Sequence, residues 1–409
     1  MSIDKLLENE QKYFVNTYSR PRFILDRGKG VYLYDLNGRK YLDFTSGIAV
    51  NVLGYGDSGI RKVLIKQSRK LWHCSNLFLS EPPLRLAKLL IDNSFADKVF
   101  FCNSGTEAVE GAIKFARKWA KKEKGKNFSK IIAFRGSFHG RTMGALSATG
   151  QAKLWEGFEP LLPDFIFAEF NNLESVKSVI NENVCAILVE PIQGEGGIHI
   201  ATKEFISGLK ILCNNYNCLL IFDEVQCGLG RTGKFFAYEN YGVEPDIVTL
   251  AKALAGGLPL GAILLKDSIS SYIKPGDHGS TFGGGPLICS VSEYILKRIM
   301  SKKLLASVLR KGDYLKVQLQ SLRIDYPEIT DIRSVGLMVG IDVNIDAKKL
   351  VELCYKNALL IAKAGDNTVR FLPPFIIQRS QIDEGIKKFK NALKKYRQLF
   401  IHSSFSHQT

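Results

Sequence analysis

The chain has 409 residues, of which 45% are hydrophobic and 23% are charged. This composition is typical of a globular enzyme and excludes a disordered or fibrous protein. The length predicts two domains rather than one core. Lysine and arginine exceed the acidic residues by 56 to 40, a formal net charge of +16. The basic segments 121–124 and 386–397 have the pattern of solvated helix faces, which we favour over a nucleic-acid partner.

Cysteine and histidine usage argues against disulfides and metals. None of the eight cysteines forms a CxxC pair, and several stand in apolar runs, so we expect buried, reduced thiols. The six histidines show no metal-binding spacing, and no metal is expected. The first ten residues lack an apolar signal core, and no run is long enough to cross a bilayer. The expected location is the cytoplasm, with no membrane partner.

The predicted elements begin with a hairpin, in which segments 30–35 and 40–44 flank the turn residues Asn37 and Gly38. From about Val63 onward, short apolar strands alternate with helical patterns, including a helix over 107–121. The expected strands are 99–102, 131–134, 185–189, 219–222, 247–250 and 261–265. Uninterrupted apolar strands of this kind suit a sheet that is buried on both faces.

The sequence therefore predicts an α/β protein with two domains. We expect a large domain over 56–299, in which helices sandwich a mostly parallel sheet. A smaller α+β domain would combine the two ends of the chain, 1–55 and 300–409.

Polar residues follow several predicted strands directly, at the edge of an open α/β sheet where ligands bind. After strand 99–102, the turn of Ser104, Gly105 and Thr106 leads into a helix whose free N–H groups could hold a phosphate. An ordinary helix cap is the alternative. After strand 219–222, Asp223 could pair with a protonated ring nitrogen and Gln226 could bond a ring oxygen. The alternative for Asp223 is a structural loop cap.

Two further strand ends carry candidate groups. Lys252 is the only charged residue between Asp246 and Lys266, and desolvation would make its amine nucleophilic. A lysine that merely reaches solvent is the alternative reading of that position. After strand 131–134, Phe138 could stack on a ring and Arg141 could hold a carboxylate, unless they are core filler and a surface cation.

One motif is rejected. Residues 228–233 match GxGxxG, but five residues separate the motif from the preceding strand and no clear helix follows. Nicotinamide binding is therefore not expected.

Seven segments, in this order, resemble the class-III, fold-type-I aminotransferases: 103–108, 137–141, 190–197, 222–226, 230–233, 249–252 and 279–282. The resemblance implies a pyridoxal 5′-phosphate cofactor that is held by Lys252 as a Schiff base. It also implies that Lys252 then moves the proton and that Asp223 pairs with the pyridine nitrogen. The other implied cofactor contacts are Ser104, Gly105, Thr106, Phe138, Val225, Gln226 and, from the neighbouring subunit, Thr281. The family therefore implies a homodimer with shared sites.

Within the family, segments 146–150, 157–163 and 370–374 resemble the acetylornithine branch. That likeness implies that Arg141 and Ser280 bind the amino donor and that Arg370 binds 2-oxoglutarate. Glu195 would be a neutralising neighbour of Arg370, and Tyr18 would line the pocket. Gly285 and Val109 depart from the branch, which often has asparagine at both positions.

Other readings stay open at this point. Ornithine, 4-aminobutyrate or succinyldiaminopimelate could be the donor. The chain could also be an aminomutase or epimerase of the same fold, or a basic nucleic-acid-binding protein with a vestigial site.

Overall fold

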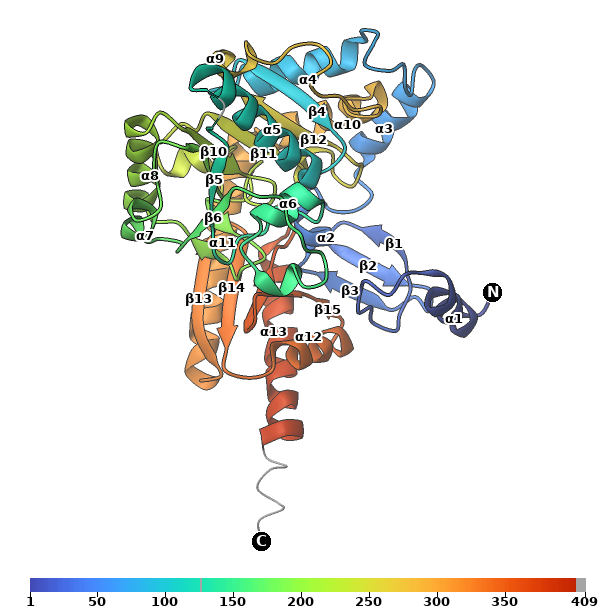
Figure 1. Cartoon of the computed structure of the whole chain (residues 1–409). Helices are drawn as coiled ribbons and strands as arrows, with labels where there is room; N and C mark the ends of the chain where they lie inside the picture. The colour runs from blue at the N-terminus through green and yellow to red at the C-terminus, as the bar shows by residue number, and fades with distance from the viewer. Residues whose placement is uncertain (126, 402–409) are drawn as a thin grey trace.

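The computed structural model describes residues 1–125 and 127–401. Its centre is a seven-stranded sheet in the order β4-β12-β11-β10-β7-β5-β6 (Figure 1). The strands are β4 (Lys98–Cys102), β5 (Lys130–Phe134), β6 (Phe165–Ala168), β7 (Val184–Val189), β10 (Leu219–Asp223), β11 (Ile247–Leu250) and β12 (Gly261–Leu265). All run parallel except β12, which is antiparallel to both of its neighbours. The predicted α/β class with a mostly parallel sheet is confirmed.

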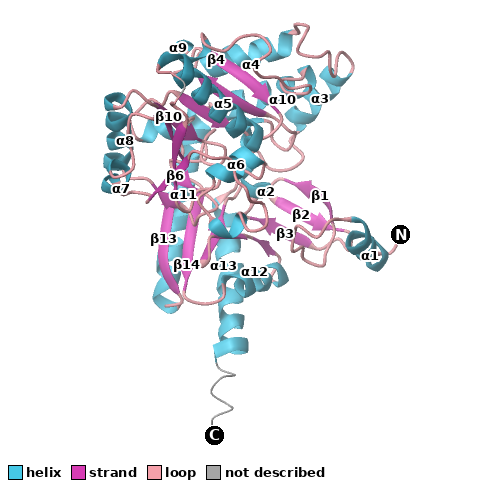
Figure 2. Ribbon diagram, in the orientation of Figure 1, coloured by secondary structure: helices cyan, strands magenta, loops and turns pink. Residues whose placement is uncertain are grey.

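Both faces of this sheet are buried because successive side chains of a strand point to opposite sides. In β10, Leu219 and Ile221 join the core under α5 (Gly105–Glu123), whereas Leu220 and Phe222 join the larger core on the other face. Helices that cover the sheet include α4 (Glu81–Ile91), α8 (Lys203–Asn215) and α10 (Pro286–Ile299) (Figure 2). Shorter helices are α6 (Met143–Ala148), α7 (Leu173–Lys177) and α9 (Asp267–Ser270).

A second sheet brings the two ends of the chain together. The antiparallel strands β1 (Leu25–Lys29), β2 (Tyr32–Asp35) and β3 (Lys40–Asp43) are extended by β15 (Leu359–Leu360), which pairs parallel with β3. The predicted hairpin is confirmed as β2 and β3, and β1 lies beside it. The helix α1 (Ile3–Tyr13) precedes this sheet, and α2 (Ser46–Ala49) follows it.

The C-terminal part contains a third sheet, in the order β13-β14-β17-β16. Its strands are β13 (Ile329–Val335), β14 (Met338–Val343), β16 (Ala362–Ala364) and β17 (Thr368–Phe371), and its helices are α11 (Lys302–Asp325), α12 (Ala347–Lys356) and α13 (Arg379–Tyr396). A π-helix over Arg397–Ile401 ends the described chain. One hydrophobic core runs from the central sheet into this part. The domain boundaries at 55/56 and 299/300 stay a prediction.

Two sequence expectations about side chains and segments can be compared with the structure. All eight cysteines are free, and all but Cys74 are buried. Among the described residues, no helix has the length and apolar character needed to span a membrane.

Candidate active site

The carboxyl ends of β4, β5, β7, β10 and β11 converge on a cavity of about 470 Å³. The sequence-predicted residues that line it are Ser104, Gly105, Thr106, Phe138, Arg141, Glu195, Asp223, Val225, Gln226 and Lys252. They come from five separate loops, each entered from a strand of the central sheet. These residues therefore lie where we expected them, just beyond the carboxyl ends of the strands.

The turn from β4 into α5 leaves free backbone N–H groups at one end of the cavity. The Ser104 hydroxyl accepts a hydrogen bond from the Glu107 amide at 3.2 Å, and the Glu107 carboxylate accepts one from the Asn103 amide at 2.8 Å. These two bonds fix the first turn of the helix beside the cavity. A β-carbon on Gly105 would stand 2.7 Å from a Val225 methyl group, so only glycine leaves this wall open. The positive end of the α5 dipole makes the turn suitable for an anionic group.

Asp223 is a buried carboxylate at the tip of β10, held by three polar contacts. The Val225 amide donates to Oδ1 at 3.0 Å, and the Thr249 hydroxyl donates to the same oxygen at 3.1 Å. Nδ1 of His139 lies 2.7 Å from Oδ2. Asp223 and Thr249 face each other in register across β10 and β11. The neighbouring strand thus orients this carboxylate.

Lys252 follows β11 and extends its amine into the same cavity. Its backbone has a φ of 39°, a left-handed conformation that is unfavourable for a lysine and is found preferentially at functional sites. Burial lowers the pKa of the Lys252 amine below its ordinary value, although Glu195 and Asp223 partly oppose the shift. Among residues 1–125 and 127–401, nothing accepts a hydrogen bond from this amine. The arrangement supplies a reactive amine.

Glu195 and Arg370 form an ion pair at the side of the cavity. Nη1 of Arg370 lies 2.6 Å from Glu195 Oε1, and Nη2 lies 3.1 Å from Oε2. Nη1 also donates to Oε1 of Gln226 at 3.0 Å, while Nε has no partner among the described residues. Burial alone would raise the pKa of Glu195, but the Arg370 guanidinium lowers it below its usual range. Arg370 is thus a buried anion-binding group, and in this structure the bound anion is the Glu195 carboxylate.

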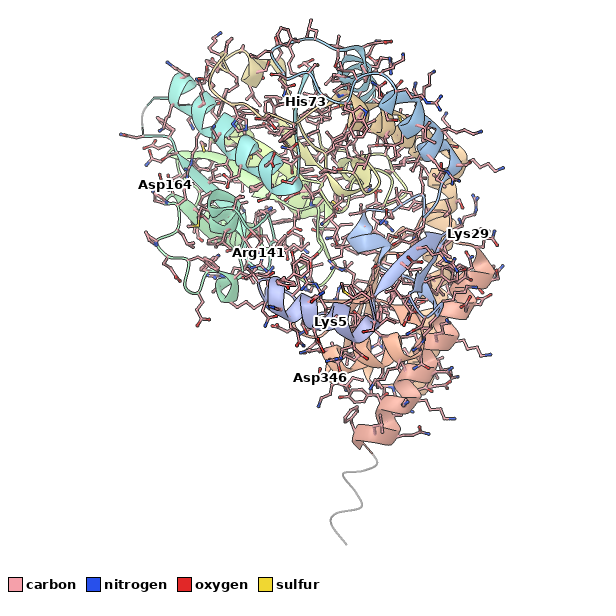
Figure 3. The ribbon with its side chains drawn as sticks, turned by 90° about the vertical axis from the view of Figure 1, so that its right-hand side faces the viewer. Lys5, Lys29, His73, Arg141, Asp164 and Asp346 are labelled. Carbon is pink, nitrogen blue, oxygen red and sulfur yellow. The ribbon has the colours of Figure 1, made fainter. Side chains whose placement is uncertain are left out.

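Phe138 and Arg141 form the outer wall. The Arg141 guanidinium lies 5.7 Å from the centre of the Phe138 ring. Arg141 is exposed and is labelled on the face of the molecule shown in Figure 3. It is thus placed at the mouth of the cavity, where an incoming carboxylate would meet it.

Four predicted residues do not line the cavity of their own chain: Arg370, which contacts the lining residues Glu195 and Gln226, and Ser280, Thr281 and Tyr18. Ser280 lies behind the α5 turn, where its hydroxyl accepts from the Asn103 side-chain amide at 3.1 Å. Thr281 is exposed next to it. Tyr18 is 68% exposed, in a segment before β1 that has no regular structure, with its ring 5.0 Å from the Arg20 guanidinium. The structure therefore does not bring Tyr18 to this pocket within one chain.

Two residues that the sequence analysis did not nominate belong to the site. His139 contacts Asp223, and Glu190 accepts the amides of Phe138 at 2.9 Å and Gly194 at 3.2 Å. Burial raises the pKa of Glu190 to about 7. Glu190 directly follows β7, so the strand-end rule could have identified it. Only the tertiary structure brings His139 to Asp223.

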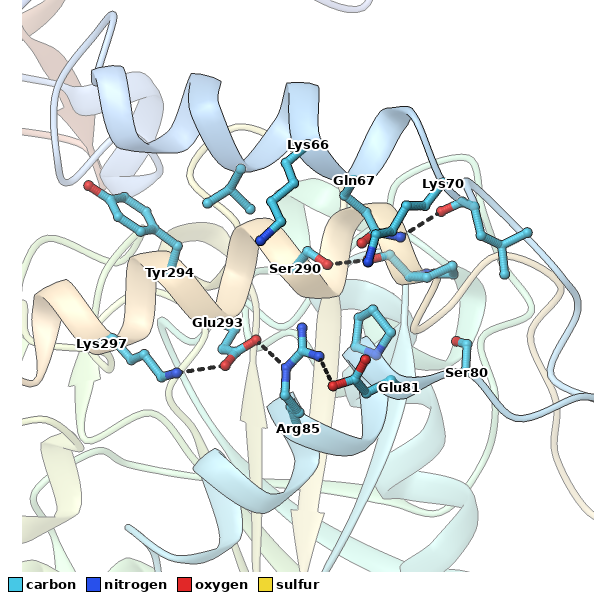
Figure 4. A pocket seen from close by; sticks show the side chains of 14 residues that line it. Lys66, Gln67, Lys70, Ser80, Glu81, Arg85, Ser290, Glu293, Tyr294 and Lys297 are labelled. Atoms are coloured by element: carbon cyan, nitrogen blue, oxygen red, sulfur yellow. Dashed lines mark hydrogen bonds and ion pairs between the residues drawn. The ribbon is translucent and has the colours of Figure 1, made fainter.

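A second cavity, of about 630 Å³, lies between α3 (Ser58–Ser68), α4 and α10 (Figure 4). Its two carboxylates are already engaged. Arg85 pairs with Glu81 and with Glu293, which also pairs with Lys297 at 2.6 Å. None of the predicted site residues lines this cavity, so it is not the candidate active site.

The donor set of the Lys252 cavity fits a phosphorylated pyridine aldehyde. A helix N-terminus without a side chain at Gly105 suits its phosphate, the Asp223 carboxylate suits a protonated ring nitrogen, and the desolvated Lys252 amine suits its carbonyl. Among the described residues, no group of three or more His, Cys, Asp or Glu side chains could hold a metal ion.

Comparison with known proteins agrees with this fit. Residues 13–393 match the family described as aminotransferase class-III. An acetylornithine aminotransferase of Clostridium acetobutylicum is 47% identical over 94% of the chain and its own full length. A succinylornithine transaminase of Photorhabdus laumondii is 42% identical over 96% of the chain and its own full length.

Among solved structures, the ornithine aminotransferase from Toxoplasma gondii superposes with a TM-score of 0.93 at 30% identity, covering 97% of this chain and 96% of its own. The family match spans far more than half of the chain. The chain therefore belongs to the class-III aminotransferases, enzymes that use pyridoxal 5′-phosphate.

Proposed function

We propose that the chain transfers the terminal amino group of N2-acetyl-L-ornithine to 2-oxoglutarate, giving N-acetylglutamate 5-semialdehyde and glutamate in arginine biosynthesis. The observation that carries this proposal is one cavity that combines the Lys252 amine, the Asp223 carboxylate and Arg141, with Arg370 bonded to Glu195 and Gln226 of its lining. The name and 47% identity of the Clostridium acetobutylicum relative support the choice of donor. The cofactor, when bound, supplies an electron-withdrawing ring that makes a proton on the donor carbon removable.

The residues of this chain then have distinct roles in the proposal. Ser104, Gly105 and Thr106 would hold the phosphate, Phe138 would cover the ring and Val225 would line its site. Asp223 keeps the ring nitrogen protonated, with its orientation set by Thr249 and His139. Gln226 bonds the ring oxygen.

The Lys252 amine would remove a proton from the donor carbon and deliver it to the aldehyde-derived carbon of the bound cofactor. Its lowered pKa favours the neutral base that this step needs.

The two arginines account for the two substrates. Arg141, at the open mouth, receives the α-carboxylate of the amino donor. While Glu195 neutralises Arg370, this guanidinium presents no unpaired charge to the donor. When 2-oxoglutarate enters, its carboxylate replaces that of Glu195 as the bidentate partner of Arg370. One pocket can thus serve both half-reactions.

The active enzyme is proposed to be a homodimer with shared sites. Apolar side chains crowd the surface around segment 72–79: Leu77 and Leu79 are each 86% exposed, and Trp72 is 63% exposed. Such a patch supports an interface with a second chain. Asn76 of this segment donates to the Ser280 carbonyl oxygen at 2.7 Å, so the patch is continuous with Ser280 and Thr281. Thr281 would then reach the cofactor phosphate, and Ser280 the amino donor, in the neighbouring chain.

A donor panel tests the proposal. Purified enzyme with pyridoxal phosphate and 2-oxoglutarate is assayed with acetylornithine, succinylornithine, ornithine and 4-aminobutyrate. We expect the highest kcat/KM with acetylornithine. A higher value with succinylornithine would assign the second candidate function, which the 42% identical relative favours. The proposal would be refuted if ornithine or 4-aminobutyrate were turned over efficiently and neither acylated donor were turned over at all.

A further inference from the structure

A separate basic cavity of about 670 Å³ lies between segment 19–23, the start of β3, α12 and β16. We call it the α12 cavity. It shares no lining residue with the Lys252 cavity. The face that carries α1 and α12 is turned toward the viewer in Figure 3, where Asp346, the residue before α12, is labelled.

The charge of the α12 cavity is strongly unbalanced. One carboxylate, that of Glu352, stands among six cationic side chains: Arg20, Arg22, Arg39, Lys348, Lys356 and Lys363. Arg20 pairs with Glu10 at 2.6 Å, and Arg39 donates to the Lys356 carbonyl oxygen. Within the described part of the chain, the side chains of Arg22, Lys348 and Lys356 have neither a hydrogen bond nor an ion pair. Like charges gathered around one hollow repel each other unless an anion lies between them.

Lys348 is also poorly placed for the stability of its own helix. It lies in the first turn of α12, where the helix dipole disfavours a cation. Its neighbour Lys349 occupies the same turn but faces the Asp346 carboxylate at 3.9 Å. Helix stability therefore does not account for Lys348, whereas an anion in the cavity would.

The floor of the α12 cavity is apolar and aromatic. Phe23 stacks on Tyr41 with ring centres 4.7 Å apart, and Tyr355 meets Phe23 edge-on at 6.1 Å. The Tyr41 hydroxyl donates to Asp35 at 2.9 Å, and the Tyr355 hydroxyl donates to the Ile361 carbonyl oxygen at 3.1 Å. Because both hydroxyls are engaged, these tyrosines offer mainly carbon surface to the cavity, beside the buried Val351.

We propose that the α12 cavity binds a small phosphorylated compound that carries a planar ring. The phosphate would lie among Arg22, Lys348 and Lys356, which have free donors, and the ring would rest on Phe23 and Tyr355. A cationic rim above an aromatic floor fits both parts of such a ligand. The volume lies within the usual range for small-molecule sites, roughly 300–1,000 Å³.

Isothermal titration calorimetry on the holoenzyme, with adenosine 5′-monophosphate as the probe, tests this proposal. The cavity variant is Lys348→Ala/Lys356→Ala. The matched control is Lys394→Ala/Lys395→Ala, which removes two exposed lysines of α13 that do not line the cavity. We expect saturable binding at one site per chain in the wild type. Affinity should fall at least about tenfold in the cavity variant and stay within about twofold in the control, because two charge-assisted hydrogen bonds are lost in the former alone.

Pyrophosphate, which has the charge but no ring, is the second probe and should bind more weakly than the nucleotide. Absence of saturable nucleotide binding would overturn the proposal, as would an unchanged affinity in the cavity variant. Equal losses in the two variants would mean that the overall positive charge, rather than this cavity, attracts the probe. Pyrophosphate binding as tight as that of the nucleotide would remove the role of the aromatic floor and refute the proposal as stated.

Discussion

Nδ1 of His139 lies 2.7 Å from Oδ2 of Asp223, and both side chains are buried. Together with the Val225 amide and the Thr249 hydroxyl, the imidazole fixes the direction in which this carboxylate points. Nε2 of His139 has no partner among the described residues, so the ring is held chiefly by its contact with Asp223. The strand-tip acid is therefore positioned by three separate segments of the chain.

Replacing Asp223 by asparagine should slow the chemical step far more than it weakens cofactor binding. The amide keeps the shape but cannot keep a ring nitrogen protonated, and we expect kcat to fall by at least about 100-fold. Absorbance-monitored titration with pyridoxal phosphate and steady-state kinetics would separate the two effects. Asp26→Asn, at an exposed position, is the control. Unchanged turnover in Asp223→Asn would remove this role.

The Lys252→Ala variant should lose both turnover and the visible absorbance of the covalently bound cofactor. Acid–base and nucleophilic roles are combined in one amine, so we expect a loss of at least about 10⁴-fold in kcat. Lys234→Ala removes an exposed lysine outside the cavity and should behave as the wild type. Normal activity of Lys252→Ala would overturn the site assignment.

Arg370→Lys should impair the acceptor more than the donor. Lysine keeps the charge but cannot reproduce the two-point contact that Arg370 now makes with Glu195. We expect the KM for 2-oxoglutarate to rise about tenfold or more, with a smaller change in the donor half-reaction measured by single-turnover absorbance. Arg135→Lys, which alters a surface pair with Glu169, is the control. Equal effects on both half-reactions would argue against an acceptor-specific role.

Glu190 predicts a pH dependence of stability. Its pKa is about 7 in the folded chain because it is buried, against roughly 4.3 in an unfolded chain. The folded state therefore holds the proton more tightly, and this stabilising contribution is complete below about pH 4 and is lost as the pH rises through 7. Urea unfolding of the apoproteins measures the free energy of unfolding at each pH. Between pH 5 and pH 8, we expect this free energy to rise in Glu190→Gln relative to the wild type. Exposed Glu156→Gln should show no such trend, and a constant difference for Glu190→Gln would contradict the assignment.

The proposed dimer predicts that a charge in the apolar patch separates the subunits. Leu79→Asp should give a monomer in sedimentation equilibrium and lose at least about tenfold in activity, because Thr281 would no longer reach its partner's site. Leu36→Asp places the same charge at an exposed leucine in the turn between β2 and β3 and should leave the assembly intact. A fully active Leu79→Asp monomer would show that each chain is sufficient alone.

The strands were predictable because their apolar runs are uninterrupted and end at a polar residue. The predicted strand 219–222 differs from β10 by one residue, and 247–250 and 261–265 match β11 and β12. The predicted helix 107–121 lies within α5. Strand β6, Phe-Ile-Phe-Ala, has the same kind of apolar run and was overlooked, whereas β1 was missed because its sequence, Leu-Asp-Arg-Gly-Lys, lacks apolar alternation.

The placement of candidate residues at strand ends was predictable, whereas their supporting contacts were not. The partnership of His139 with Asp223 joins residues 84 positions apart, and no local pattern encodes it. The rejected glycine motif illustrates the same limit. After it the structure has only a short 3-10 helix over Ala237–Asn240, and Arg231 is buried, with its guanidinium donating to the Leu337 and Pro373 carbonyl oxygens. Sequence spacing could argue against a nucleotide loop there, but the long-range packing of Arg231 emerges only from the tertiary structure.

The parallel pairing of β3 with β15 has a consequence for biosynthesis. Leu42 is opposite Leu359, so the edge of that sheet stays unpaired until nearly the whole chain has left the ribosome. The central strands from β4 to β12 are all made earlier and can fold first. Until β15 is made, β3 carries an unpaired edge of the kind that can pair with other chains, and joining strands so far apart in sequence is intrinsically slow.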